Sequence, residues 1–466
     1  MCKYLSLLIS LFISVTIIAQ PHSIVINKVI FEGNSHTTDK AIQKELDFSA
    51  GDTLSLVLLN EIFQRNKLYI LSTGLFNQSE INLINYDTDK NLADIVILLQ
   101  ENWYLFPVPI FELADRNFSV WWQEQHKSLS RVNYGFRIAH YNLTGNRDPI
   151  KFKAHVGYTK KYQLEYSRPY LAIDNKLGLG MNIFYSENKE IGYKTIANKT
   201  LYAKNEDERK LLSRFRVGPE LKFRPDVNNF HALRIEYHHN KIDPFVANTL
   251  NEEYFLDGKT NLRFFFIEYD YNFDKRSLRQ YPLGGNLLFF NIKKEGLGVF
   301  GDHNSLSITA GIENHISPLR KIYFSNRNKA KVNLIRNQAA FANNTGLGWD
   351  EDIVSGYELY VMDGTDYVIS MNAVKWQVLE NNMKMIEWFP KQFKKMNLAI
   401  FIRVNLDFAF VNEPLYRETN SLNNRWIYGY GPAIDFILFN NFLFSFEYSF
   451  NDIGERGLFF HNSFAF

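Results

Sequence analysis

The feature that most constrains this chain is an alternation of apolar and polar residues that recurs from Trp103 to the last residue, Phe466. In IRVNLDFAF (Ile402–Phe410) and FLFSFEYSF (Phe442–Phe450), every second residue is apolar or aromatic, and most residues between them are polar or charged. This period of two is typical of β-strands whose two faces meet different surroundings. The pattern therefore predicts an all-β fold for this part of the chain, with an aromatic face and a charged face.

The composition favours a membrane barrel over a soluble β protein. Aromatic residues make up 16% of the 466 residues, with 40 Phe and 26 Tyr, whereas the mean hydropathy of −0.25 is too polar for a helical membrane protein. In a transmembrane barrel only every second residue faces lipid, which accounts for both numbers. A soluble core rarely grows to this size in one piece, and strands in lipid must close on themselves to pair their backbone. A soluble all-β protein remains the alternative.

About sixteen alternating segments lie between the turn signals, and an even number is expected for a bacterial single-chain barrel. The predicted strands are Trp103–Leu113, Val132–Tyr141, Lys151–Thr159, Gln163–Tyr170, Leu177–Tyr185, Ser213–Phe223, His231–Lys241, Leu262–Phe273, Asn286–Lys294, Ser305–Ile316, Lys321–Ile335, Asp366–Leu379, Asn397–Phe410, Trp426–Phe439, Phe442–Phe450 and Gly457–Phe466. The eleventh and twelfth are weakly patterned, so a barrel of fourteen strands remains open.

The first twenty residues resemble a cleavable secretory signal. Lys3 precedes an apolar run from Tyr4 to Ile18, and Ala19-Gln20 follows it. The run is short for a membrane span, although a single membrane anchor is the alternative. The only cysteine, Cys2, lies in this segment. We therefore expect the mature chain to have no disulfide and no cysteine-based metal site.

Residues 21–102 have a different pattern, because strand-like and helix-like segments follow one another. A strand over Ser23–Phe31 precedes two helical segments, the second over Leu56–Leu71, and two further strands cover Ser79–Tyr86 and Ala93–Glu101. This β-α-α-β-β order is enough for one small α/β domain. The predicted division is a signal peptide over 1–20, an α/β domain over 21–102 and a barrel over 103–466.

The stretch Asn337–Thr365 interrupts the alternation between the eleventh and twelfth predicted strands. It contains Gly346, Gly348, Gly356 and Gly364, and it fits neither the strand period nor the helix period. Loops of this length in a compact fold are usually functional or disordered. The stretch is therefore predicted to be a long loop between two strands.

Two short sequence motifs in the small domain, FEGN (Phe31–Asn34) and TGLF (Thr73–Phe76), lie where its turns are expected. With the order of the elements, they resemble a polypeptide-transport-associated (POTRA) domain, although any small α/β domain is the alternative. The resemblance implies docking of an unfolded client by strand addition to a sheet edge. A photoreactive residue in Ala93–Glu101 is the expected probe of such a client.

Several short sequence motifs in the barrel segment are similar to those of the BamA/TamA-type superfamily of outer-membrane assembly factors, the bacterial surface antigen family. They include NLTGNRDPIKF (Asn142–Phe152) and YQLEYSRPYL (Tyr162–Leu171). DKRSLRQYPLGG (Asp274–Gly285) resembles the family's D-x-R-D…P-x-x-G turn, and VSGYELYVMDG (Val354–Gly364) resembles the V-R-G-Y/F-E motif of a loop that folds back into the barrel. The second resemblance implies that the stretch Asn337–Thr365 folds into the barrel lumen, with an ordinary external loop as the alternative.

The resemblance carries over to particular residues and fails at three. The matching or corresponding positions are Asp274, Arg276, Pro282 and Gly285 in the turn, Val354, Ser355, Gly356, Tyr357 and Glu358 in the loop, and Phe464 and Phe466 in a terminal insertion signal. Ser277 stands where the second acid is usual, and His461 stands where a glycine is usual. Ser355 stands where the family's arginine reaches the barrel wall, so the sequence leaves open how the loop is held.

The resemblance implies an outer-membrane protein of the Gram-negative type with its POTRA domain in the periplasm. Such a protein assists the insertion, assembly or translocation of unfolded outer-membrane or secreted polypeptides, in contact with lipid and with accessory assembly proteins. The implied route is a seam between the first and last strands, which Pro107 and Pro109 weaken because each lacks a backbone donor. A single-client secretion pore or a passive channel is the alternative.

No pattern in the sequence predicts an enzyme or a cofactor. We find no H-E-x-x-H, no G-x-S-x-G and no phosphate-binding glycine loop, and the net charge of +2 gives no reason to expect nucleic acid. His238 and His239 are neighbours in a strand and point to opposite faces, so they cannot share a metal ion. Carboxylates such as Asp407 and Glu447 are expected on any wet lumen face. We expect no catalytic residue, metal or cofactor.

Overall fold

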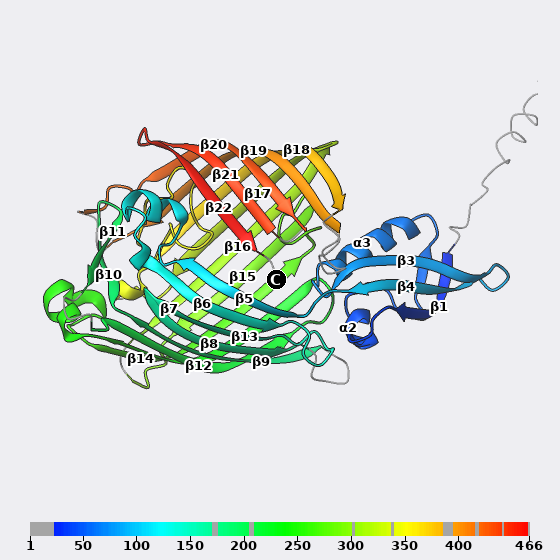
Figure 1. Ribbon diagram of the computed structural model, residues 1–466, viewed down its shortest axis with the longest axis horizontal. Coiled ribbons are helices and arrows are strands. Elements are labelled where there is room, and N and C mark those ends of the chain that lie inside the picture. The colour runs from blue at the N-terminus through cyan, green and yellow to red at the C-terminus, as the bar shows by residue number, and fades with distance from the viewer. Residues whose placement is uncertain are drawn as a thin grey trace, which may run out of the picture.

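The computed structural model describes residues 23–169, 176–204, 209–300, 303–336, 340–384, 395–414, 419–439 and 442–464. The predicted signal peptide therefore lies outside the described residues. A small domain with a four-stranded sheet lies at one end of a large barrel (Figure 1). We call the barrel end beside this domain the near mouth and the opposite end the far mouth.

The small domain packs two helices on one sheet. Its elements are β1 (Ser23–Glu32), α2 (Asp39–Gln43), β2 (Thr53–Ser55), α3 (Leu59–Leu71), β3 (Phe76–Asp87) and β4 (Leu92–Glu101). The strand order is β2-β1-β4-β3, with β1 parallel to β4. Thr38 caps α2 by accepting a hydrogen bond from the Ala41 N–H. Ile26, Ile70 and Ile95 are among the fully buried side chains of its core.

The barrel is one antiparallel sheet of sixteen strands, which confirms the predicted number and removes the alternative of fourteen. Its strands are β5 (Leu105–Leu113), β6 (Val132–His140), β7 (Ile150–Gly157), β8 (Thr159–Arg168), β9 (Leu177–Asn188), β12 (Leu212–Phe223), β13 (Asn229–Ile242), β14 (Asn261–Asp274), β15 (Gly285–Glu295), β16 (Ser305–Leu319), β17 (Ile322–Asn333), β18 (Asp366–Lys384), β19 (Lys395–Asn412), β20 (Trp426–Leu438), β21 (Phe442–Asn451) and β22 (Arg456–Phe464). The two weakly patterned strands, β17 and β18, pair from Ile322↔Trp376 to Lys331↔Tyr367.

The sheet carries its apolar side chains outward. On β19, Ile402, Val404, Leu406 and Phe408 are exposed, whereas Asn405 and Asp407, which alternate with them, are buried. A soluble barrel would have the opposite arrangement, because its apolar face would form the core. The outward apolar face and the polar interior confirm a transmembrane barrel. Among the described helices, none is long and apolar enough to cross a membrane.

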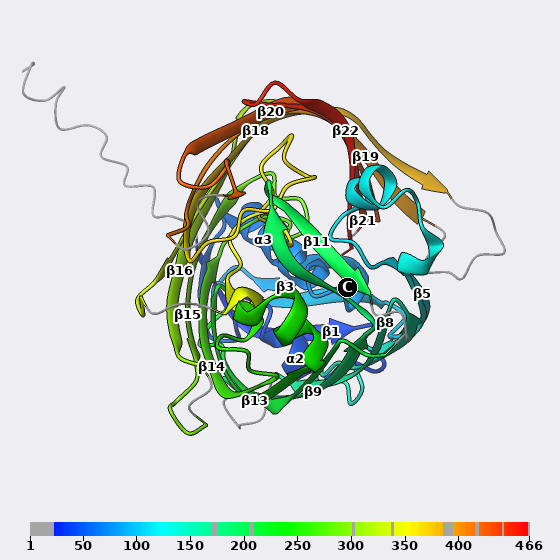
Figure 2. The same cartoon turned by 90° about the vertical axis from the view of Figure 1, so that its left-hand side faces the viewer.

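A hairpin of β10 (Glu190–Ile196) and β11 (Lys199–Lys204) leaves the barrel wall and crosses the far mouth (Figure 2). At its tip the Ala197 N–H donates to the Thr419 carbonyl at 2.8 Å. No strand pattern in the sequence predicts this hairpin. Its tip, Ala197-Asn198, has positive φ at both residues, but it is not one of the Asn-Gly or Asp-Gly pairs that mark such turns.

Candidate functional site: the lumenal loop, the domain joint and the seam

The loop before β18 lies inside the barrel. We call residues 340–365 the lumenal loop; residues 337–339 of the predicted stretch lie outside the described residues. Leu347, Val354 and Tyr357 of the loop are fully buried, and they pack in one cluster with Ala409 of β19 and Ile427 of β20. An apolar contact with the inner wall therefore holds the loop, in addition to its polar contacts.

The predicted motif Val354–Glu358 makes several polar contacts with the barrel wall. The Ser355 N–H and Oγ donate to Oδ2 of Asp407 at 3.1 and 2.7 Å. The Gly356 carbonyl accepts from Nδ2 of Asn451 at 2.8 Å, and the Tyr357 hydroxyl donates to Asp452. Gly356 has a φ of +81°, and a Cβ there would lie 2.8 Å from the Phe450 carbonyl oxygen. Glycine is therefore required for both its conformation and its close approach.

The barrel wall supplies an arginine that Asn405 links to Ser355, the position where the family's loop arginine is absent. Arg403 of β19 donates through Nε to Asp435 at 2.8 Å and lies 3.3 Å from Glu447. Asn405 donates to Glu447 at 2.7 Å and to Oγ of Ser355 at 3.4 Å. Arg403 thus compensates the buried carboxylates of Asp435 and Glu447, whereas Ser355 is hydrogen-bonded to a third wall carboxylate, Asp407. The sequence does not reveal this arrangement, because Arg403 has the strand position of any lumen-facing cation.

Glu358 joins the lumenal loop to the last strand. Its Oε1 lies 3.5 Å from Nε2 of His461 on β22, and its carbonyl accepts from Nδ2 of Asn117 at 2.6 Å. Asn117 lies in the loop between β5 and β6. The position at which this sequence departs from the family's terminal glycine, His461, is therefore in contact with the motif of the lumenal loop.

The predicted turn motif lies at the near mouth, between β14 and β15. Asp274 accepts from Nε of Arg276 at 2.9 Å, and Arg276 pairs with Glu313 at 2.8 Å. Gly285 has a φ of +90°, and a Cβ there would lie 2.1 Å from the Lys275 carbonyl oxygen. The Pro282 carbonyl accepts from Nζ of Lys375 at 3.4 Å. The motif therefore builds a tight turn rather than a chemical site.

The same turn crosses the near mouth to the opposite wall. Tyr281 packs on Phe401, with ring centroids 4.9 Å apart, and its hydroxyl donates to Asp435 at 2.7 Å. Gln280 donates to Oγ of Ser463 on β22 at 2.7 Å. Tyr281 and Gln280 lie inside a motif that the sequence analysis quoted, but a sequence pattern carries no signal for contacts across a lumen.

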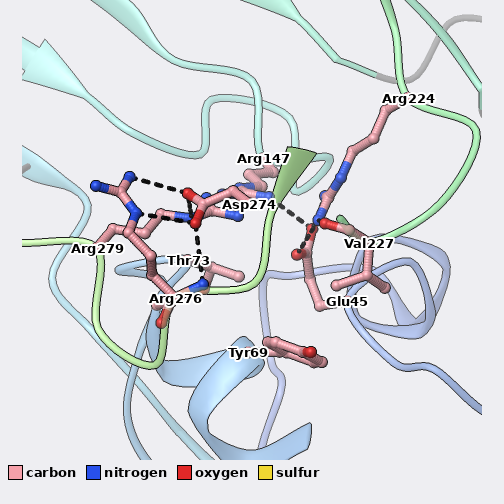
Figure 3. A pocket seen from close by; sticks show the side chains of 10 residues that line it. Glu45, Tyr69, Thr73, Arg147, Arg224, Val227, Asp274, Arg276 and Arg279 are labelled. Carbon is pink, nitrogen blue, oxygen red and sulfur yellow. Dashed lines mark hydrogen bonds and ion pairs between the residues drawn. The ribbon is translucent and has the colours of Figure 1, made fainter. Parts of the chain in front are cut away.

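An ionic cluster joins the small domain to the barrel (Figure 3). Glu45, which follows α2, accepts from Arg147 in the β6–β7 turn and from Arg224 in the β12–β13 turn, both at 2.6 Å. Asp274 and Arg279 line the same small pocket. Burial, and then the positive charge of Arg147, lower the pKa of Arg279. The cluster therefore gathers several arginines around two carboxylates, those of Glu45 and Asp274.

Backbone contacts reinforce this joint. The Thr38 N–H donates to the Gly145 carbonyl at 2.9 Å, and Nε2 of His36 lies 2.6 Å from the Asn142 carbonyl. The preceding turn of the small domain is itself held by Glu101, which accepts from the Thr37 N–H at 2.6 Å. These contacts and the ionic cluster together fix the orientation of the small domain at the near mouth.

The first and last strands form the two ends of the sheet order. Within the described part of the chain, β5 pairs with β6 and β22 pairs with β21, and no register joins β5 to β22. We call these two facing edges the seam. Phe464 is the last residue of β22 and pairs with Phe442, whereas Phe466 lies outside the described residues.

The backbone donors of β5 show why its edge is weak. The Tyr141 N–H donates to the Tyr104 carbonyl and the Ala114 N–H donates to the Arg131 carbonyl, so even-numbered residues of β5 are hydrogen-bonded to β6. In an antiparallel pair, hydrogen-bonded residues alternate with residues whose N–H and C=O groups point away from the partner strand. The N–H and C=O groups of the odd-numbered residues of β5 therefore point to the seam. Pro107 and Pro109 are odd-numbered, so the free edge lacks two donors.

The remaining predicted residues do not form a second site. His238 faces the lumen, where it contacts Glu236 at 2.8 Å and stacks on Phe266; His239 contacts Tyr237 instead. A cavity of about 460 Å³ beside His238 is lined by residues of β12–β15, by Tyr254 and Phe255, and by Ala342 and Asn343 of the lumenal loop. Among the described residues, no group of three His, Cys, Asp or Glu side chains could hold a metal ion.

Comparisons with known proteins agree with this architecture. Residues 24–102 match the POTRA family, described as a surface antigen variable number repeat, and residues 142–369 match the Omp85 superfamily domain. No curated protein matches the chain by sequence.

Two solved structures have a similar fold. BamA from Haemophilus ducreyi lacking POTRA domains 1-3 is 16% identical with a TM-score of 0.53, over 94% of this chain and 84% of that chain. CdiB from Escherichia coli is 11% identical with a TM-score of 0.55, over 95% of this chain and 76% of that chain. The chain therefore belongs to the Omp85 superfamily of BamA/TamA-type outer-membrane proteins, with a POTRA domain followed by a C-terminal β-barrel.

Proposed function

We propose that this protein inserts or translocates unfolded polypeptides at the outer membrane by pairing them with the edges of its seam. Members of the Omp85 superfamily are transport and assembly proteins of the outer membrane. The finer assignment rests on one observation: among the described residues, no backbone pairing joins the edges of β5 and β22, whereas structured segments cross both mouths of the lumen.

The segments that cross both mouths of the lumen argue against an open channel. The turn that carries Tyr281 reaches Asp435 on the opposite wall at the near mouth. At the far mouth, Asn198 of the hairpin tip accepts from the Val361 N–H of the lumenal loop at 2.8 Å and from the Leu422 N–H at 3.0 Å. A polypeptide that passed through the lumen would have to break both sets of contacts. A polypeptide that paired at the seam would break neither.

The POTRA domain offers an edge of its own. We propose that it lies in the periplasm and presents β3 to unfolded clients. In the sheet order β2-β1-β4-β3, β4 is flanked on both sides, so its backbone is already paired, and β3 is the long edge strand. The strand Ala93–Glu101, which we expected to be the place for a photoreactive probe, is therefore a poor choice. Residues on β3, such as Tyr86, are the better positions for capturing an added strand.

The experiment uses the full chain in liposomes and a urea-unfolded, eight-stranded outer-membrane barrel as the client probe. A photoreactive residue replaces Phe111 at the β5 edge, which is 74% exposed. The matched control replaces Val404 in the middle of the sheet, which is 53% exposed. We expect adducts with the probe from position 111 and far fewer from position 404. Equal yields from the two positions would contradict pairing at the seam.

A conductance measurement separates this proposal from the alternative of a pore. In a planar bilayer, the crossed lumen should give a small conductance with rare openings. A large and steady conductance would favour a secretion pore or passive channel and would overturn the proposed route. The proposal itself requires no catalytic group, because a client strand gains its stability from backbone pairing.

A further inference from the structure

We propose that residues 114–131, the loop between β5 and β6, form a latch that closes the far part of the seam on its membrane side. The inference deepens the proposed function and rests on it for its biological role. The latch is fixed to the β5 side by ion pairs and hydrogen bonds, and it touches β22 through aromatic rings. Figure 2 shows this segment, in cyan, beside β22 and β21 at the far end of the barrel.

The base of the latch is a buried ion pair. Arg131 donates to both carboxylate oxygens of Asp115, with the shortest contact at 2.6 Å, and both side chains are almost fully buried. Arg131 also pairs with Glu190 of β10, and its guanidinium lies over the rings of Tyr158 and Tyr202 at 4.7 and 4.4 Å. Because this ion pair joins the two ends of the loop, it fixes the base of the latch.

The latch is also tied to the elements inside the barrel. Arg116 donates to the carbonyls of Gly348 and Tyr360 at 3.1 and 2.8 Å, both in the lumenal loop. Glu124 pairs with Lys199 of the hairpin at 2.6 Å. Together with the hydrogen bond from Asn117 to the Glu358 carbonyl, these contacts couple the latch to the lumenal loop and to the β10–β11 hairpin that crosses the far mouth.

The contact with β22 is different in kind. The ring of Phe118 meets the ring of Phe460 edge to face, with centroids 5.8 Å apart, and Phe118 stacks on Trp122 at 5.5 Å. Phe460 pairs with Phe446 in the sheet, and Phe446 is an exposed, outward-facing residue. Phe118 therefore reaches the membrane side of β22, past the edge where backbone pairing is absent.

This asymmetry is what a releasable closure requires. In the described part of the chain, the ion pairs and hydrogen bonds of the latch run to β6–β11 elements and to the lumenal loop, and its contact with β22 is the ring pair. An aromatic pair contributes little compared with a buried ion pair that loses one partner. When the seam opens, β22 can leave Phe118 while the latch stays in place. A client strand then meets an aromatic surface already positioned beside the free β5 edge.

The first test is hydrogen exchange of β22 in the full chain, in liposomes and without any client. Phe118→Ala should make the amides of residues 457–463 exchange roughly two- to tenfold faster, the effect of losing one aromatic pair. Phe215→Ala on β12 is the control, because Phe215 and Phe118 are both 37% exposed. Unchanged exchange in the Phe118 variant would overturn the latch, whatever the protein's clients are.

The second test locks each side of the latch in turn, with Cys2 changed to Ser. The pair F118C and F460C ties the latch to β22, and the matched pair E124C and K199C ties it to the hairpin on the fixed side. Oxidation of the first pair should stop insertion of the urea-unfolded barrel probe, and reductant should restore it, whereas oxidation of the second pair should have no effect. Failure of the first pair to oxidise while the second does, or insertion that continues with the first pair oxidised, would overturn the proposal.

The two readouts separate the latch from the proposed function. If the unsubstituted protein inserts no probe at all, the proposed function fails, and the hydrogen exchange of β22 still decides whether residues 114–131 hold the seam. If the probe is inserted but neither exchange nor oxidation responds as expected, the latch fails and the proposed function stands.

Discussion

The joint between the POTRA domain and the barrel differs from the seam in every interaction that holds it. At the joint, Glu45 meets two arginines at 2.6 Å in a buried cluster, and the Thr38 N–H pairs with the Gly145 carbonyl. At the seam, no register joins the two strands in the described part of the chain, and the ring pair of Phe118 and Phe460 spans the gap.

The difference indicates which part of the molecule is built to move. Buried ion pairs are costly to break, because the partner that remains is left charged and desolvated. An unpaired edge can exchange one partner for another with little loss, since its backbone groups are already free. We therefore expect the POTRA domain to stay in one orientation while the seam opens, so that the domain delivers a client to a fixed place.

Glu45→Ala should have the largest effect, because it leaves Arg147 and Arg224 without their shared carboxylate. Removal of one partner from a buried pair costs about 3–5 kcal/mol. We expect the POTRA domain to detach and to sample many orientations, measured as a broad distribution of spin-label distances between α3 and the barrel. Glu61→Ala, at an exposed position of α3, is the control. A narrow, unchanged distribution for Glu45→Ala would show that the backbone contacts alone fix the joint.

Pro107→Val combined with Pro109→Val should hold the seam closed more strongly, which would make the seam resemble the firmly held joint. The double variant restores two backbone donors at the free edge of β5, and each hydrogen bond contributes roughly 0.5–1.5 kcal/mol. We expect slower amide exchange in β22 and slower insertion of an unfolded barrel probe.

The control for this variant lies on the same strand. Leu105→Val and Phe111→Val occupy positions with the same backbone orientation but add no donor, so they should leave exchange in β22 unchanged. Faster probe insertion by the proline double variant would mean that the missing donors limit client pairing rather than closure.

The strands could be predicted because their signal is local. Each strand alternates between lipid and lumen, so residues such as Val404 and Asp407 carry the pattern by themselves, and all sixteen predicted segments correspond to strands of the barrel. Loop and turn motifs could be predicted in part, since Gly356 and Gly285 are demanded by positive φ and close backbone approach.

The contacts across the lumen could not be predicted, because they join residues far apart in sequence. Tyr281 donates to Asp435, and Asn198 donates to Asn423 at 2.9 Å. Tyrosine at position 281 and asparagine at position 198 are both ordinary residues for a turn, so the sequence gives no sign of these contacts. The support of the lumenal loop could not be predicted either, because Ser355 removes the expected arginine and Arg403 stands 48 residues further along the chain. The link from Arg403 through Asn405 to the Ser355 hydroxyl becomes visible only when the strands are placed side by side.

Ser355→Ala should have a smaller effect than changes at the joint or the prolines. It removes the Oγ donor to Asp407 at 2.7 Å, while the Ser355 N–H still donates to the same oxygen. One such hydrogen bond contributes about 1 kcal/mol. We expect several-fold faster cleavage of residues 340–365 by a protease added at the far mouth. Ser305→Ala, at the start of β16, is the control; equal cleavage of the two variants would mean that apolar packing alone holds the lumenal loop.

Acid should loosen the joint by the smallest amount, through Glu101. Burial raises the pKa of this carboxyl, but hydrogen bonds from Thr37 and Ser35 outweigh it and hold the pKa below its usual value of 4.5. The ionised carboxylate therefore stabilises the turn that carries His36 and Thr38, fully so above pH 4.5, and the contribution is lost as the pH falls through the lowered pKa. We expect the spin-label distances across the joint to broaden progressively as the pH falls below 4.5. Glu101→Gln should remove most of this pH dependence, because the amide cannot ionise. A joint that responds to acid equally in both proteins would place the acid-sensitive group elsewhere.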